Sequence, residues 1–254
     1  DCRTGTSGWL TAPKLECSGL VELPVRGDLA GGNVSRPSFD VVERYEDAGT
    51  EIPLESLAFY NGTPDSGLTI LSATANPYGA VYPDGIYWID AQGKDITIAN
   101  SRLVATLAIR NANRITLTGA LIWEPHANQG VTLVSDSPIV LIDIEPSLEE
   151  ATFAANFNPP GTPYRGIDEN LSLTDRFPTE LRGIIYSSSN IVVAPTTDGQ
   201  PLAITGAVIC NDLRLYHHLY VRSFDEVLTN VPIGFADPTQ YRFKVGTFRR
   251  VPTP

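Results

Sequence analysis

The sequence predicts an all-β protein built on a right-handed parallel β-helix, with an irregular N-terminal segment that contains one short helix. Three observations carry this prediction. Short blocks of alternating Ile, Leu, Val and Thr follow one another from residue 85 onward. Asn, Gly, Asp or Ser residues bound these blocks, as expected for tight turns. Two of the blocks, at Asp95 and Arg114, start 19 residues apart, which fits one circuit of three short strands.

Residues 1–84 form the irregular N-terminal segment, which we expect to cap the fold. Within it, the stretch "SRPSFDVVERYEDAG" at residues 35–49 predicts a short helix that stops at its final Gly. Phe39, Val42 and Tyr45 recur at a spacing of three, so we expect them to lie on one face of this helix.

Residues 85–235 carry the strand blocks of the predicted β-helix. The phrase Thr-Gly-Ala, flanked by apolar residues, occurs at 118–120 and again at 205–207, and we interpret it as a repeated rung. A loop-rich insertion at about 145–182 interrupts the blocks, and a connection of this length is typical of a functional segment. Residues 236–254 form a C-terminal cap and tail. An antiparallel β-sandwich is the alternative fold, because it explains each strand but not the approximate repeat.

The composition limits the classes of partner. The 254 residues carry a net charge of −11 and only three Lys, which argues against nucleic acid because its phosphates would repel this surface. A membrane surface is also disfavoured as a partner, because the sequence contains no polybasic run. No stretch reaches the roughly 18 consecutive apolar residues that span a bilayer. The sequence shows no cofactor-binding motif, so no cofactor is predicted.

The acidic, Lys-poor composition favours an extracellular or cell-surface protein. Because the chain contains no Met, even at position 1, we expect it to be a processed piece whose anchoring or targeting segment lies upstream. N-glycosylation sequons begin at Asn33, Asn61 and Asn170.

The three cysteines predict one disulfide and no metal site. Cys2 and Cys17 lie close together in a segment rich in Gly, Thr and Ser, and a bridge between them would contribute about 3 kcal/mol by constraining the unfolded chain. The alternative is that both stay reduced. Cys210 lies within an apolar strand block and is interpreted as a small core residue. The Cys spacing matches no metal-binding motif.

Candidate catalytic residues are few. Asp143 and Glu145 alternate with apolar residues, which would place both carboxylates on one face of a strand about 6.5 Å apart. A solvated strand end explains them more simply. His217 and His218 are expected on opposite faces of a strand, where they cannot share one metal ion. His126 has no Ser or Cys nucleophile nearby in the sequence. We therefore predict that the protein is not an enzyme.

Aromatic residues recur on the strand blocks and are candidates for a subunit interface or for stacking on sugar rings. We expect about half of them to pack in the core or in turns. The candidates are Tyr87, Trp88, Trp123, Tyr186, Tyr216 and Tyr220.

Several longer phrases carry a resemblance to a known group of proteins. They are Gly-Ile-Tyr-x-Ile-Asp-x-x-Gly-Lys-x-Ile-x-Ile at 85–98, "GALIWEP" at 119–125, "NFNPPGTPY" at 156–164, "GIIYSSSNIVV" at 183–193 and "TNVPIGF" at 229–235. The order resembles the β-helical ectodomains of planctomycete surface proteins, and more loosely minor-pilin-like proteins of type IV pilus systems. The final phrase keeps only one of the prolines of that family's ending. The resemblance implies an extracytoplasmic structural or assembly role and transfers no catalytic residues.

The sequence thus predicts an extracellular structural or assembly subunit of a filament, a pilus-like appendage or an envelope layer. It would act through contacts with copies of itself or with other surface or pilus proteins. The alternatives are a non-catalytic carbohydrate-binding or adhesive module and a polysaccharide-degrading β-helix enzyme.

Overall fold

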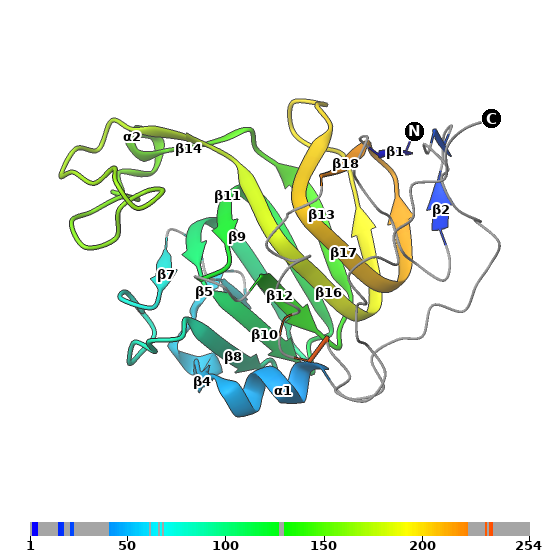
Figure 1. Ribbon diagram of the computed structural model, residues 1–254, viewed down its shortest axis with the longest axis horizontal. Helices are drawn as coiled ribbons and strands as arrows, with labels where there is room; N and C mark the ends of the chain where they lie inside the picture. The colour runs from blue at the N-terminus through cyan, green and yellow to red at the C-terminus, as the bar shows by residue number, and fades with distance from the viewer. Residues whose placement is uncertain are drawn as a thin grey trace, which may run out of the picture.

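The computed structural model is predominantly β, with one large sheet and two short α-helices (Figure 1). It describes residues 2–4, 15–17, 21–22, 41–60, 62–65, 67, 69–126, 130–222, 232 and 234–235. The prediction of an all-β protein is therefore confirmed. No helix in the described ranges is long and apolar enough to cross a membrane.

Within the described residues, the strands fall into a sheet of 16 strands and a separate pair, β14 and β15. In chain order they are β1 Cys2–Thr4, β2 Leu15–Cys17, β3 Val21–Glu22, β4 Thr50–Glu51, β5 Ala58–Tyr60, β6 Thr63–Asp65, β7 Ile70–Ser72, β8 Ile86–Asp90, β9 Asp95–Val104, β10 Thr106–Arg110, β11 Arg114–Glu124, β12 Val131–Ser135, β13 Ile139–Ile144, β14 Ser147–Glu149, β15 Arg176–Pro178, β16 Glu180–Val193, β17 Leu202–Leu215 and β18 Leu219–Arg222. The helices are α1 Val41–Ala48 and α2 Glu150–Phe153, with a 3-10 turn, η1, at Leu54–Ser56.

Almost all strand pairs in the large sheet are parallel. β9 pairs with β11, β11 with β13, β13 with β16 and β16 with β17, all in parallel. Asp95 pairs with Arg114, so the first residues of these two blocks, 19 positions apart, lie side by side in parallel strands. Among the described strands, only β5–β6 and β14–β15 run antiparallel. The antiparallel sandwich alternative is therefore wrong.

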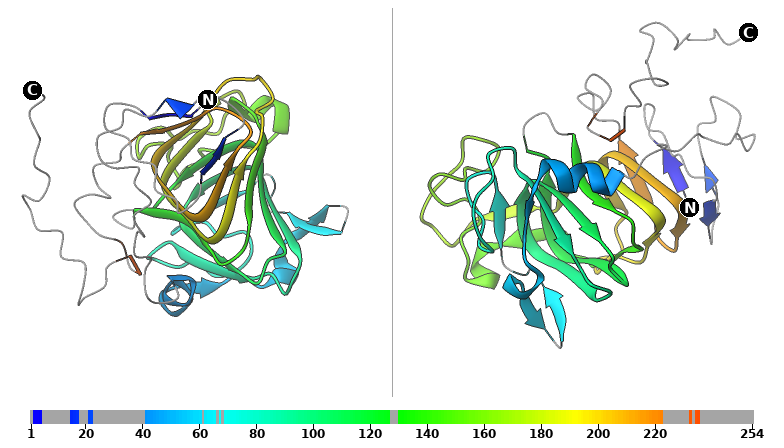
Figure 2. Two further views of the ribbon diagram at one scale, coloured as in Figure 1. Left: turned by 90° about the vertical axis from the view of Figure 1, so that its right-hand side faces the viewer. Right: turned by 90° about the horizontal axis from the view of Figure 1, so that it is seen from below.

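This register stacks like residues in columns along the interior. One column joins β7, β9, β11, β16, β17 and β18, and another joins β9, β11, β13, β16 and β17. The first contains Leu71, Leu103, Trp123, Leu181, Ile204 and Val221, and the second contains Ile96, Ile115, Ile139, Ile191 and Leu213. All of these side chains are buried. The strands curve around this shared apolar interior, as the end-on view shows (Figure 2), and burial of such columns is the main stabilising contribution.

The two Thr-Gly-Ala phrases occupy different places in the sheet. Gly119 adopts a left-handed φ of 66° where the pairing of β11 with β9 shifts register. Gly206 pairs with Gly183, and a Cβ at position 206 would collide with the Gly183 carbonyl oxygen. Ile204 stacks through Leu181 on Trp123, not on Leu117. The two phrases lie in the same sheet, but equivalent residues of the two phrases do not stack on one another. The interpretation of a repeated rung is therefore wrong.

Helix α1 forms where the sequence predicts it and covers the outer surface of several strands. Its buried residues are Val41, Val42 and Tyr45. They pack with side chains of β8, β10, β12 and β16, among them Ile86 and Ala108. Figure 1 shows the helix running beneath the β8, β10 and β12 strands. Phe39, the third predicted residue of this face, lies outside the described residues.

Segments of the first 84 residues lie at both ends of the stack (Figure 1). β4 pairs with β8, and β6 and β7 pair with β9, at the end formed by the first long strands. β1 pairs with β18 and β2 pairs with β17, at the opposite end. Parallel pairing at both ends shields strand edges that would otherwise stay unpaired.

Candidate functional site

The six aromatic candidates do not form one exposed stripe. Tyr87, Trp123 and Tyr186 are buried. The Tyr87 hydroxyl donates to the Ser72 carbonyl oxygen at 2.8 Å, and Trp123 Nε1 donates to the Ala105 carbonyl oxygen at 3.0 Å. These two polar atoms thus have partners inside the protein, as buried Tyr and Trp usually do.

The other three aromatic candidates are more accessible but do not share one element. Trp88 is half-buried on β8, where the Arg110 guanidinium lies 5.2 Å from its ring centroid. Tyr216, 57% exposed, follows β17, and half-buried Tyr220 lies on β18. Half of the predicted aromatic set therefore belongs to the core.

The acidic and histidine candidates lie at bends. Asp143 has a φ of 50°, so the chain bends there and does not continue the strand alternation between Asp143 and Glu145. Both side chains are exposed. His217 and His218 lie in the turn between β17 and β18, with ring centroids 5.5 Å apart. The expectation that these two residues point to opposite faces of a strand is wrong, because the strand ends at Leu215.

The remaining predicted sites have mixed outcomes. Cys210 is buried in the main core, as predicted. The side chains of Cys2 and Cys17 lie outside the described residues, as do the sequon residues Asn33 and Asn61. Asn170 is described, and its Nδ2 donates to Asp175 Oδ2 at 2.6 Å. No three His, Cys, Asp or Glu side chains within the described ranges are grouped as metal ligands.

The insertion, residues 145–179 in the structure, is a folded unit and not a plain loop. β14 and β15 pair antiparallel at its base, and α2 follows β14. Its two ends meet, because the Thr179 backbone N donates to the Pro146 carbonyl oxygen at 2.9 Å and Thr179 Oγ1 donates to the Glu145 carbonyl oxygen at 2.5 Å. The insertion therefore leaves and rejoins the stack at one point (Figure 1).

A small apolar core fixes the insertion against the outer surface of β11. It joins Ala120 and Ile122 of β11 with Leu148, Phe157 and Phe177 of the insertion. All five side chains are buried. Because β11 also faces the main interior, this strand is covered on both sides, which explains its nearly continuous apolar sequence.

Arg102 of β9 holds the centre of the insertion. Arg102 is only 2% exposed, and its Nη1 donates to the Phe157 and Thr162 carbonyl oxygens, at 2.7 and 2.6 Å. Nη2 donates to the Pro163 carbonyl oxygen at 2.7 Å. The Tyr164 ring centroid lies 5.8 Å from the Arg102 Cζ. Burial lowers the pKa of Arg102, and three carbonyl acceptors make the buried cation tolerable without an ion pair.

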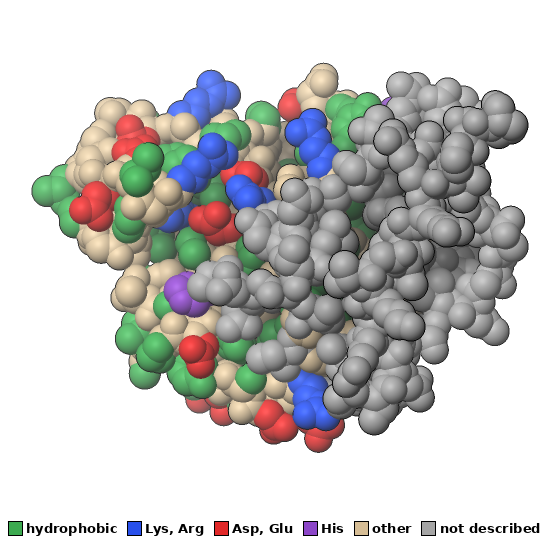
Figure 3. Space-filling model, in the orientation of Figure 1, with side chains coloured by type: hydrophobic (Ala, Val, Ile, Leu, Met, Phe, Trp, Pro, Cys, Tyr) green, Lys and Arg blue, Asp and Glu red, His purple; other side chains and the backbone are tan. Residues whose placement is uncertain are grey.

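The outer end of the insertion displays large apolar side chains. Ile167 is 88% exposed, Leu171 83% and Leu173 44%. We call these three residues the apolar tip. Hydrophobic side chains are visible on the insertion at the left of the space-filling view (Figure 3). The chain around the tip is tied down, because Tyr164 N donates to the Asp168 carbonyl oxygen at 2.7 Å.

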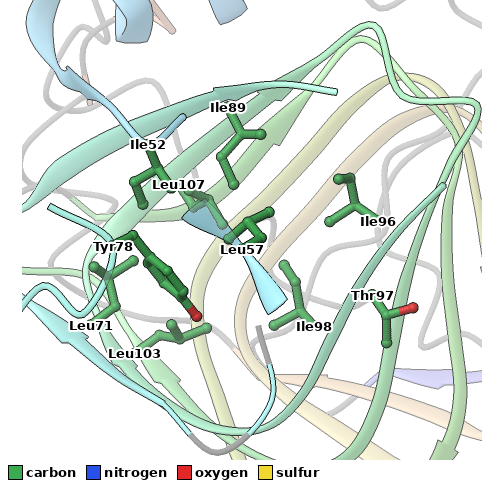
Figure 4. A pocket seen from close by; sticks show the side chains of 10 residues that line it. All are labelled: Ile52, Leu57, Leu71, Tyr78, Ile89, Ile96, Thr97, Ile98, Leu103 and Leu107. Atoms are coloured by element: carbon green, nitrogen blue, oxygen red, sulfur yellow. The ribbon is translucent and has the colours of Figure 1, made fainter. Parts of the chain in front are cut away.

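Two hollows among the described residues bear on the search for a site. One, lined by ten side chains of which only Thr97 and Tyr78 carry polar groups, lies inside the first turns of the stack (Figure 4). It encloses a cavity of about 10 Å³, room for one water molecule at most. The other is a surface groove of about 200 Å³ at the base of the insertion, lined in part by Glu145, Phe153 and Arg176. In this groove Arg176 forms an ion pair with Glu149, with 3.1 Å between Arg176 Nε and Glu149 Oε1.

Sequence reasoning missed the residues that organise the insertion. Arg102 stands alone in the apolar run "SRLVATL", and a single cation in a strand predicted to be buried was the available signal. Glu150 is fully buried, yet it stands beside Glu149 in a segment that reads as polar surface.

Comparison of the chain with protein-family models, with curated proteins and with solved structures gives no significant match.

Proposed function

We propose that the protein is a structural or assembly subunit of an extracellular layer or appendage, and that it acts by binding further copies of itself through the apolar tip. The observation that carries the proposal is the exposure of Ile167, Leu171 and Leu173 on an insertion that is fixed at its base. Large exposed apolar patches on ordered elements are typical of interaction sites, because water solvates them poorly.

The anchoring of the insertion supports this role. A tip that is held by the Arg102 guanidinium and by an apolar core loses little conformational freedom on binding. A pre-organised surface therefore uses more of its contact energy for affinity. A flexible loop with the same side chains would bind more weakly.

The same proposal includes a right-handed parallel β-helix as the architecture and the cell surface or the extracellular space as the location. The inward columns of Ile and Leu support a solenoid, since each strand stretch repeats its neighbour's pattern one circuit later. The location rests on the acidic, Lys-poor composition and on the resemblance to surface proteins.

Light scattering after size-exclusion chromatography, with negative-stain imaging, tests the proposal. We expect the wild type to form regular assemblies, and the double variant Ile167→Asp/Leu171→Asp to elute as a monomer at the same concentration. Val81→Asp is the control, since it places a charge at an exposed apolar position outside the insertion. A monomeric wild type, or a double variant that still assembles, would contradict the proposal.

A further inference from the structure

A polar cluster lies inside the insertion, beneath the apolar tip. Glu150 and Asn158 are fully buried, and Asp175 is half-buried. Glu150 Oε1 accepts a hydrogen bond from Phe157 N at 2.7 Å, and Oε2 accepts one from Asp175 N at 3.1 Å. Asn158 Nδ2 lies 3.3 Å from Asp175 Oδ2. These contacts bring three distant parts of the insertion together at one place.

The cluster carries two carboxylates with little compensating charge. In the part of the chain that the structure describes, no Lys or Arg forms an ion pair with Glu150 or Asp175. Arg102 is directed to backbone carbonyl oxygens of the insertion. Burial of an ionised carboxylate is costly, and two backbone N–H donors offset only part of that cost for Glu150.

Asn158 supplies an independent sign of a ligand. Its side chain is fully buried, and its Oδ1 has no hydrogen-bond partner among the described residues. Rotating the amide by 180° would not help, because it would bring Oδ1 against the Asp175 carboxylate, acceptor to acceptor. Both hydrogen bonds to the Asp175 carboxylate, from Asn158 and Asn170, go to Oδ2. Asn158 therefore has a buried acceptor oxygen without a donor, on the same amide group whose nitrogen contacts the Asp175 carboxylate.

We propose that Asn158 Oδ1 and the carboxylates of Asp175 and Glu150 form a binding site for a calcium ion. All the candidate ligands are oxygens, which hard divalent cations prefer, and the cluster contains no His or Cys that would favour zinc. Calcium accepts six to eight oxygens in irregular geometry and so can add waters on the half-exposed side of Asp175. Magnesium needs a stricter octahedral arrangement, which suits this cluster less well.

Calcium at this place would neutralise both carboxylates and join α2, the middle of the insertion and the residue that precedes β15. It would therefore stiffen the support of the apolar tip. The site does not depend on self-association, because its ligands lie within one chain.

Isothermal titration of CaCl₂ into chelator-treated protein, with MgCl₂ in a parallel titration, tests the site. We expect one calcium ion per chain with a dissociation constant on the order of 10⁻⁴ M, and weaker binding of magnesium. The thermal midpoint of unfolding should rise with CaCl₂. A wild-type protein that shows neither binding heat nor a midpoint shift would overturn the proposal, whatever its state of association.

Two variants identify the ligands. Asp175→Asn and Asn158→Ala should each weaken calcium binding at least tenfold, whereas Asp168→Asn, an exposed carboxylate of the same insertion, should leave it unchanged. Far-UV circular dichroism shows which variants keep the wild-type fold. Unchanged calcium affinity in a folded Asp175→Asn or Asn158→Ala protein would overturn the assignment. The full-length chain is used throughout, since the insertion packs on β11.

Discussion

Tyr45 is a buried side chain whose polar atom has no partner. Its side chain lies in the interface between α1 and the sheet, fully buried, and its hydroxyl has no hydrogen-bond partner among the described residues. Burial raises the pKa of Tyr45 above its ordinary value of 10.0. The ring contributes packing, whereas the hydroxyl costs free energy.

The variant Tyr45→Phe should therefore be more stable than the wild type by about 1 kcal/mol, because it removes an unsatisfied buried hydroxyl. The raised pKa adds a pH dependence. In the wild type the unfolded tyrosine ionises above about pH 10 while the folded one stays protonated, so the free energy of unfolding falls as the pH rises further.

Urea denaturation between neutral pH and pH 11 measures both effects for Tyr45→Phe. The decline in unfolding free energy above pH 10 should be shallower in the variant by about one proton per molecule. Equal slopes in the two proteins would show that Tyr45 ionises equally in the folded and unfolded states.

Among the structural elements, the insertion depends on one side chain of β9. Arg102 donates to carbonyl oxygens of Phe157, Thr162 and Pro163, which have few alternative donors in a buried place. Arg165, by contrast, is exposed and pairs with Glu180 at 3.1 Å. The two arginines therefore differ in burial and in the kind of acceptor: Arg102 holds the insertion from β9, whereas Arg165 lies within the insertion and pairs with Glu180 of β16.

The variant Arg102→Ala should lose about 3 kcal/mol of stability, since it leaves buried carbonyl oxygens without donors. Arg165→Ala should lose less than about 1 kcal/mol, as is usual for an exposed ion pair. Hydrogen exchange should become faster in residues 156–164 of the Arg102 variant only. Similar exchange in both variants would mean that Arg102 does not anchor the insertion.

The strands were predictable from the sequence, but the contacts of the insertion were not. Alternating apolar residues locate β8 to β13, because side chains of a strand point alternately to its two faces and the apolar ones mark the buried face. The partners of Arg102 are backbone carbonyl oxygens 55 to 61 residues away, and a carbonyl leaves no mark in the sequence. The bends at Asp143 and after Leu215 depend on local φ and on strand length, so the alternation rule failed there.

For the whole molecule, the stack and the insertion should behave as separable folding units. The insertion begins and ends beside the hydrogen-bonded pair Pro146 and Thr179. Replacing residues 147–178 by a short Gly linker should therefore leave the columns of the stack intact. The cost should be limited to exposure of Ala120 and Ile122, about 2–3 kcal/mol.

Far-UV circular dichroism and thermal unfolding of this deletion protein provide the measurement. We expect a strand-rich spectrum and one cooperative transition at a lower midpoint than in the full chain. The deletion protein should also be monomeric and bind no calcium. Loss of the cooperative transition would show that the stack needs the insertion in order to fold.

Helix α1 has a mechanical consequence for the stack that it covers. It packs across β8, β10 and β12, which are successive neighbours in the sheet. A pull along the stack axis loads the hydrogen bonds between neighbouring strands, which can open one after another. The helix resists the separation of these strands, because pulling two neighbouring strands apart would expose Val41, Val42 or Tyr45, which pack against them. Tension along the stack would thus be shared among several pairs of strands.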